Sequence, residues 1–212
     1  MMETVLDESR IHPLIRTERL DIVEADGTIK LSIFNGKRIP PPLMDGEDLL
    51  PGHRQDWNAA GMIFFNSEGD ECGGLLLRSD LLPEGGYRST LFTTFDQYKN
   101  DQVMSAGVSD HAGKHEHLFT LYDRPNEHIR VMLEKRKQIA ALTDEEEKQR
   151  LSAELRAQGS VRLLMGKFGD GSVGLRMNNK FGKECLALVV DADGEPHLTI
   201  RDATGEETIT TI

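Results

Sequence analysis

Apolar and polar residues alternate in short runs along most of the chain, which is the pattern of half-buried β-strands. The first two runs, at 20–22 and 29–33, flank the pair Asp26-Gly27, a strong signal for a hairpin. Glycines at 182, 194 and 205 punctuate later runs at intervals of eleven or twelve residues, as in an antiparallel meander. Further strand-like runs occupy 62–65, 74–77, 90–95, 102–104, 117–122, 161–165, 173–177, 186–190, 197–200 and 208–210.

One interval has a different period. From Ile129, apolar residues recur at the three- and four-residue spacing of an amphipathic helix. Thr143-Asp144-Glu145-Glu146 then fits a capping box in which Thr143 and Glu146 bond each other's backbone amides, and a second helix would run to about Gln158. We therefore predict a helical hairpin at 126–158, inserted into one β domain that comprises 19–125 and 159–212. Residues 1–18 are predicted to form an irregular N-terminal arm.

A proline-rich connection separates the first hairpin from the next strand. Residues 38–60 contain Pro40-Pro41-Pro42 and Trp57, the only tryptophan of the chain. Consecutive prolines favour an extended conformation, and long ordered loops are often functional. We expect this loop to pack Trp57 over one end of the core.

Two pairs of segments repeat. The frame N-x-x-G-x-E-C-x-x-L occurs at 66–75 and at 179–188, and a second strand–turn–strand unit occurs at 23–33 and at 190–200. The turn glycines of these units, Gly27, Gly69, Gly182 and Gly194, are predicted to have positive φ. Because the similar units lie near opposite ends of the chain, we expect the terminal hairpins to be neighbours in one sheet system. The predicted fold is mainly β, with antiparallel hairpin and meander repeats in a barrel, a small propeller or a sandwich.

Composition and charge exclude several classes of function. Hydrophobic residues make up 38% of the 212 positions, enough for a core, and the formal net charge is −11. The interval 126–158 is neutral, so the negative charge lies on the rest of the chain, where it opposes binding to nucleic acid or to an anionic membrane. No apolar stretch approaches the roughly 20 residues of a membrane span and the N-terminus lacks a signal-peptide pattern, so we expect a cytoplasmic protein. Two cysteines are too few for a disulfide scaffold or a zinc site.

A polar segment between two predicted strands is a candidate ligand site. It carries Asp96, Gln97, Tyr98, Asp101 and Gln102. Polar, aromatic and acidic groups of this kind can line a binding site, to which the loop residue Trp57 would contribute. The alternative is a turn in which Asp and Asn side chains cap backbone amides.

A second cluster, Asp110, His111, His115 and His117, holds four possible metal ligands within eight residues. On a strand, His115 and His117 face the same side, as a pair of metal ligands must. The alternative is that these histidines are solvated beside a loop.

Three weaker patterns have simpler explanations. Residues 169–174 fit G-x-G-x-x-G, but a strand follows where a phosphate site needs a helix, which favours a hairpin turn. Residues 191–194 contain part of a calcium loop without its later ligands. Glu71 and Glu184 occupy equivalent repeat positions, and paired carboxylates can perform acid–base work if they lie close together. The adjacent Cys72 and Cys185 are expected to be small buried apolar groups, and no cofactor is predicted.

Several segments resemble a family of bacterial proteins of unknown function. They are 69–75, 95–98 with Asp101-Gln102, and 122–125, and the resemblance spans much of 19–210. Some members of that family carry an N-terminal membrane anchor. The resemblance implies no activity and supplies no catalytic residue.

These observations favour a non-enzymatic β-repeat protein that acts in binding or self-assembly, because repeats are present and a recognisable catalytic set is not. Its partner would be another protein or a second copy, contacted through helices at 129–157 or through the proline-rich loop. The alternative is a small-molecule or carbohydrate binding protein, or a metal-dependent hydrolase, that uses loops 95–102 and 110–117.

Overall fold

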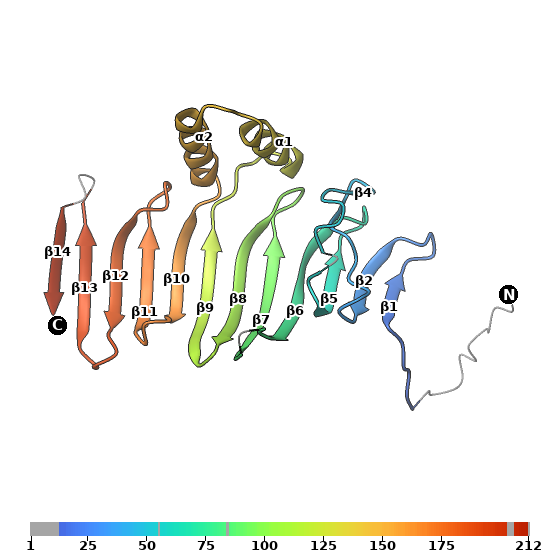
Figure 1. Ribbon diagram of the computed structural model, residues 1–212, viewed down its shortest axis with the longest axis horizontal. Coiled ribbons are helices and arrows are strands. Elements are labelled where there is room, and N and C mark those ends of the chain that lie inside the picture. The colour runs from blue at the N-terminus through green and yellow to red at the C-terminus, as the bar shows by residue number, and fades with distance from the viewer. Residues whose placement is uncertain (1–12, 55, 84, 203–205, 212) are drawn as a thin grey trace, which may run out of the picture.

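In the computed structural model, twelve strands form one antiparallel sheet (Figure 1). The structure describes residues 13–54, 56–83, 85–202 and 206–211, with the backbone alone for 207–211. The strands of the sheet are β1 (Arg19–Val23), β2 (Ile29–Phe34), β5 (Ala59–Phe65), β6 (Glu71–Leu81), β7 (Tyr87–Asp96), β8 (Gln102–His111), β9 (Lys114–Tyr122), β10 (Val161–Lys167), β11 (Val173–Asn178), β12 (Glu184–Val190), β13 (Pro196–Arg201) and β14 (Glu207–Thr211).

The sheet is an open meander in which each strand pairs with the next one in order along the chain. The mainly β, antiparallel prediction is confirmed, but the sheet does not close into a barrel or a propeller, and the described chain supplies no second sheet for a sandwich beyond the small β3–β4 pair. The expectation that the terminal hairpins are neighbours is wrong, because β1 and β14 are the two edges of the sheet (Figure 1). The similar sequences at the two ends form the same local turn. A turn does not determine which strands pair when they are far apart in the sequence.

The chemistry of those turns explains the repeats. Gly69 and Gly182 have φ of 81° and 77°, and Gly27 and Gly194 also have positive φ, as predicted. In the first frame the Asn66 side chain accepts hydrogen bonds from the amides of Glu68 and Asp70. Its equivalent, Asn179, accepts from the amides of Phe181 and Lys183. The shared frame therefore encodes one hairpin turn, used twice. The turn glycine at 205 lies outside the described residues.

The helical hairpin is confirmed between β9 and β10, as α1 (Ile129–Ala140) and α2 (Glu145–Ala157). The predicted capping box is wrong by one position: Asp144 is the N-cap of α2, and its carboxylate accepts from the amides of Glu146 and Glu147. The two helices lie beyond the ends of the central strands (Figure 1). In the described residues we find no helix of the length and apolarity that a bilayer crossing requires.

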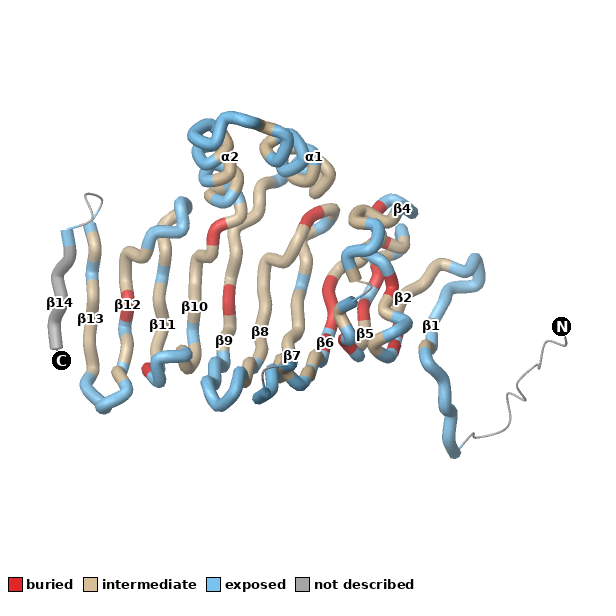
Figure 2. Tube along the Cα trace, viewed as in Figure 1, coloured by how far each residue is buried: buried red, intermediate tan, exposed pale blue. Residues whose placement is uncertain are grey.

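The proline-rich loop covers one face of the sheet at its N-terminal end. It contains the two-residue strands β3 (Leu43–Met44) and β4 (Glu47–Asp48), which pair with each other. Beneath it lies the buried core, where Trp57 packs as expected and where the buried residues of Figure 2 are concentrated. We call this side of the sheet the loop face and the opposite side the open face. The core residues are Phe34, Ile63, Phe65 and Leu76, with Ile29, Ile39, Leu43, Trp57 and Phe92 packed against them.

Candidate functional site

The open face carries apolar side chains in rows that run across the strands. Antiparallel pairing places directly opposite residues on the same side of the sheet, so each row can be followed from strand to strand. One row crosses from β1 to β13 and is apolar except for Thr93. Its members are Leu20, Ile33, Met62, Leu75, Thr93, Ala106, Phe119, Met165, Leu175, Leu188 and Leu198.

Two further rows flank the first. The second row also crosses from β1 to β13 and contains no polar side chain. It consists of Ile22, Leu31, Phe64, Gly73, Phe95, Met104, Leu121, Leu163, Met177, Leu186 and Ile200. In the third row the ionisable members are His117 and Lys167. It consists of Ala60, Leu77, Leu91, Val108, His117, Lys167, Val173, Val190 and Pro196.

Many of these side chains are exposed to solvent. Phe64 is 45% exposed, Phe95 51%, Met165 48% and Leu188 44%. Large contiguous apolar patches are uncommon on the surfaces of monomeric proteins and are typical of interaction surfaces. The alternating pattern of the sequence predicts an apolar face on each strand, which a barrel, a small propeller or a sandwich would each have buried. Because the sheet stays open, that face is available to a partner.

The loop face contains a cleft of about 290 Å³ between the proline-rich loop, the β7–β8 turn and α1. Its walls are mostly apolar and its floor is charged. The charged and amide side chains that line it are Arg54, Glu71, Asp96, Asn100, Asp101, Gln102 and Arg136, together with His53. The apolar residues are Pro42, Leu43, Met44, Leu49, Leu50, Trp57, Ile129, Met132 and Leu133.

Two ion pairs hold the floor of the cleft. Arg54 donates to Glu71 at 2.8 Å and to the carbonyl oxygen of Pro40 at 3.0 Å, which ties the proline-rich loop to the start of β6. The two side chains of that pair are only 11% and 16% exposed. Arg124 lies 3.3 Å from the Asp101 carboxylate and donates to the carbonyl oxygen of Gln102 at 2.7 Å. The loop and the β7–β8 turn are thus anchored by paired charges.

Asp96 is the most perturbed group of the cleft. Its burial, and then the neighbouring carboxylates of Glu71 and Asp101, raise its pKa from 3.8 to about 7. One oxygen of Asp96, one oxygen of Glu71 and the Nε of Arg54 are buried and have no hydrogen-bond partner among the described residues. Buried polar atoms normally have a partner, so the cleft has hydrogen-bonding capacity that the protein itself does not use.

The structure brings four of the six candidate ligand-binding residues together in this cleft. They are Asp96, Asp101, Gln102 and Trp57. The other two lie elsewhere: Gln97 donates to the carbonyl oxygen of Pro125 at 3.1 Å, and Tyr98 is 68% exposed. The Tyr98 hydroxyl donates to Glu68. Their role as ligand-binding residues stays a prediction.

The alternative interpretation of this segment, a turn with side-chain caps, also describes what the residues do. Asn100 donates to the carbonyl oxygens of Pro125 and Glu127, and its own oxygen accepts from the amide of Asp101. Asp101 in turn accepts from the amide of Gln102. The turn therefore shapes one wall of the cleft and fixes the start of the helical insertion.

Sequence reasoning missed Arg54 and paired Glu71 with the wrong carboxylate. Glu184, its counterpart in the repeat, lies on β12, six strands from β6 along the sheet, and bonds Arg201 and Arg176 instead. The partner of Glu71 across the cleft is Asp96 on β7. A repeat shows which residues have equivalent local positions, and nothing in the local pattern of Arg54 signals its contact with β6.

The four candidate metal ligands lie on the hairpin of β8 and β9. Strand alternation places Asp110, His115 and His117 on the open face and His111 on the loop face. The Nδ1 of His115 lies 3.5 Å from Asp110, which also accepts from the hydroxyl of Tyr87 at 2.9 Å. The same-side placement of His115 and His117 is as predicted, whereas His111 points away from them; metal binding here stays a prediction.

A different acidic group is gathered around Lys99. Its ammonium lies 2.6 Å from carboxylate oxygens of Asp45, Glu68 and Asp70. Among the described residues, these three carboxylates form the group whose spacing would suit a metal ion. The lysine already supplies the positive charge at their centre, so the cluster serves to join the proline-rich loop to the β5–β6 and β7–β8 turns.

The remaining sequence patterns are structural. Residues 169–171 form the β10–β11 turn, where Asp170 accepts from Ser172. Asp191 caps the β12–β13 turn and bonds His197, so the partial calcium frame is a hairpin turn. Cys72 and Cys185, which were expected to be small buried apolar groups, are free thiols that are only partly buried.

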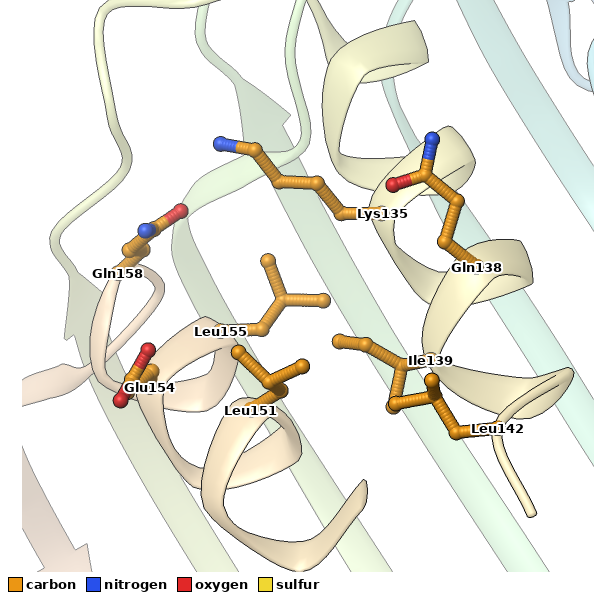
Figure 3. Close-up of a pocket in the computed structure, with 8 residues that line it drawn as sticks. All are labelled: Lys135, Gln138, Ile139, Leu142, Leu151, Glu154, Leu155 and Gln158. Carbon is orange, nitrogen blue, oxygen red and sulfur yellow. The ribbon is translucent and has the colours of Figure 1, made fainter. Parts of the chain in front are cut away.

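Figure 3 shows a second hollow, of about 400 Å³, between the two helices. Ile139 and Leu142 from the α1 side face Leu151 and Leu155 of α2, while Lys135, Gln138, Glu154 and Gln158 form its polar rim (Figure 3). This seam is the apolar face that the helical periodicity predicts. It joins the two helices to each other.

No family model, no curated protein and no solved structure matches this chain.

Proposed function

We propose that the protein is a non-enzymatic β module that self-assembles by packing the open face of its sheet against the open face of a second copy. The observation that carries this proposal is the continuity of the three apolar rows across the sheet, from β1 or β5 to β13. We place the contact surface there, and not on the helices or the proline-rich loop. The proline-rich loop covers the apolar core of the loop face, and α1 forms a wall of the cleft beside that loop.

The area of the open face is sufficient for a stable dimer. With strands about 4.8 Å apart and about 3.3 Å per residue, apolar rows that cross eleven strands and occupy five residues of each strand cover roughly 48 by 16 Å, or about 770 Å². A standard protein interface buries about 800 Å² on each partner. Complete pairing of two open faces therefore reaches the size of a specific complex.

The chemistry of the face favours a copy of the same chain as its occupant. Homodimer interfaces are more apolar than other interfaces, and within the three rows only His117 and Lys167 are ionisable. A two-fold axis that lies in the plane between the two sheets would lay apolar rows on apolar rows, as an isologous interface requires. Each copy would supply the second layer that a single sheet lacks, with the sheets about 10 Å apart.

The test is the mass of the full chain in solution. We expect light scattering coupled to size exclusion to give twice the mass of one chain for the wild type. The double variant Met165→Glu/Leu188→Glu is expected to be monomeric, because it places four carboxylates in the centre of the apolar layer of a dimer. Thr199→Glu is the matched control, since Thr199 lies on β13 facing the loop side, and we expect it to remain dimeric.

Circular dichroism of each variant separates loss of assembly from loss of fold. A wild-type chain that is monomeric at micromolar concentration would overturn the proposal, as would a folded double variant that keeps the dimer mass. If the monomeric wild type instead binds a different polypeptide through the open face, that outcome assigns the face to another protein and also contradicts self-assembly.

A further inference from the structure

We infer that the cleft between the proline-rich loop and α1 binds a small, neutral, hydroxyl-rich molecule of monosaccharide or cyclic polyol size. This inference is independent of the proposed assembly, because the cleft lies on the loop face and the assembly surface is the open face. It assigns a ligand class to residues that the fold leaves with unused hydrogen-bonding capacity.

The groups without a partner at the cleft include both a hydrogen-bond donor and hydrogen-bond acceptors. Arg54 Nε offers a hydrogen-bond donor, and the free oxygens of Glu71 and Asp96 are acceptors when ionised. A hydroxyl group donates one hydrogen bond and accepts others, so neighbouring hydroxyls can satisfy the donor and the acceptors together. A purely cationic ligand would leave the arginine without a partner, and a purely anionic one would face the carboxylates.

The charge balance also favours a neutral ligand. Arg54 pairs with Glu71 and Arg124 pairs with Asp101, and the other two charged side chains that line the cleft, Arg136 and Asp96, are of opposite sign when Asp96 is ionised. A ligand with a full charge would lose its hydration on entry without a free counter-charge in these pairs. A neutral polyol loses only hydrogen bonds with water, and the cleft groups replace them.

The size and the walls of the cleft fit such a molecule. At about 290 Å³ the cleft lies just below the range for drug-sized ligands, which begins near 300 Å³, so it suits a smaller molecule. Leu50, Trp57, Met132 and Leu133 supply apolar surface for the C–H faces of a ring. The loop and α1 form opposite walls, joined where Arg130 donates to Glu47 and to the carbonyl oxygen of Met44. The three unpaired atoms are buried, so a ligand in the cleft reaches them only where the side chains that cover them move.

Trp57 provides a direct measurement, because it is the only tryptophan of the chain and it lines the cleft. We expect its fluorescence to change in a saturable way when the full-length protein is titrated with millimolar glucose, N-acetylglucosamine or myo-inositol. Acetate and methylammonium are the charged probes for comparison, and we expect neither to produce a saturable change. Calorimetry with the same probes checks that the signal reports binding.

The repeat supplies a matched pair of variants. Glu71→Gln is expected to weaken binding of the responding probe at least tenfold, because it replaces the anionic acceptor of the cleft. Glu184→Gln changes the equivalent residue of the second repeat, outside the cleft, and we expect binding to be unchanged. Met132→Phe reduces the volume of the cleft without removing a polar group, and we expect it to abolish binding while the protein stays folded by circular dichroism.

Three outcomes would overturn the inference. They are a lack of saturable response to all three neutral probes, equal weakening by Glu71→Gln and Glu184→Gln, or unchanged binding in the folded Met132→Phe variant. A crystal structure in which ordered water alone satisfies Arg54, Glu71 and Asp96 in the presence of the neutral probes would also contradict it.

Discussion

Asp96 is held at the end of β7 in a position that disfavours its charged form. Because its pKa rises from 3.8 to about 7, the folded protein keeps a proton there that the unfolded chain releases between these two values. Stability then falls as pH rises from about 4 to about 7, since over this range the folded state binds more protons than the unfolded state. Above about pH 7, the full loss of stability caused by ionising the buried Asp96 carboxyl is present.

The first prediction at this scale concerns Asp96→Asn, which removes the titrating group and keeps the shape. We expect the variant to be more stable than the wild type at pH 8, by at most about 4 kcal/mol, because a shift of one pKa unit corresponds to 1.36 kcal/mol. The difference is expected to shrink as pH falls toward 4. Urea denaturation of both proteins at pH 4, 6 and 8 measures it. An equal difference at all three values would contradict the assignment.

A second prediction concerns Gly194, whose φ is 94° in the β12–β13 turn. A Cβ at this position would meet no atom within 4 Å, so the cost of a substitution there comes from the backbone alone. We expect Gly194→Val to lower the unfolding free energy by more than about 1 kcal/mol, because a β-branched residue avoids positive φ. Gly194→Asn is the control and is expected to cost less, since asparagine tolerates the left-handed region better. Equal melting temperatures for all three proteins would show that the turn is assigned wrongly.

At the scale of single elements, α2 depends on the residue that caps its N-terminus. Asp144, and not Thr143, accepts the free amides of the first turn. We expect Asp144→Ala to reduce stability by about 1 kcal/mol, the usual cost of removing an N-cap, and Thr143→Ala to have little effect. Thermal denaturation of the two variants compares them. A larger loss of stability in Thr143→Ala than in Asp144→Ala would instead support the capping box that the sequence pattern suggests.

Local structure was predictable here because its causes are local. Strand alternation, the turns around Gly69 and Gly182, and the helical spacing after Ile129 each depend on residues within a few positions of one another. Thr143 and Asp144 are both good capping residues, so the choice between them depends on where the preceding backbone ends and could not be settled from the pattern. The repeated segments correctly predicted the turns, but they did not show how the terminal hairpins are placed in the sheet.

At the scale of the whole molecule, the missing information concerns contacts between distant segments. The alternating pattern predicts an apolar side on each strand, but a closed barrel, a sandwich and an open sheet all satisfy that pattern. The cleft was predictable in part, since Asp96, Asp101, Gln102 and Trp57 were all candidates. Arg54 and Glu71 meet through the long proline-rich loop, and a single sequence carries no signal for such a contact.

A sheet one layer thick has a geometric consequence for any pair built on its open face. Each cleft would then look outward, away from the other, on the two external surfaces of the pair. Such a pair acts as a bridge: it connects two separate bodies that each display the ligand. It could not place both clefts on one flat surface. The gain in affinity from bivalent attachment would therefore be absent when the ligands lie on a single surface and present when they lie on two facing surfaces.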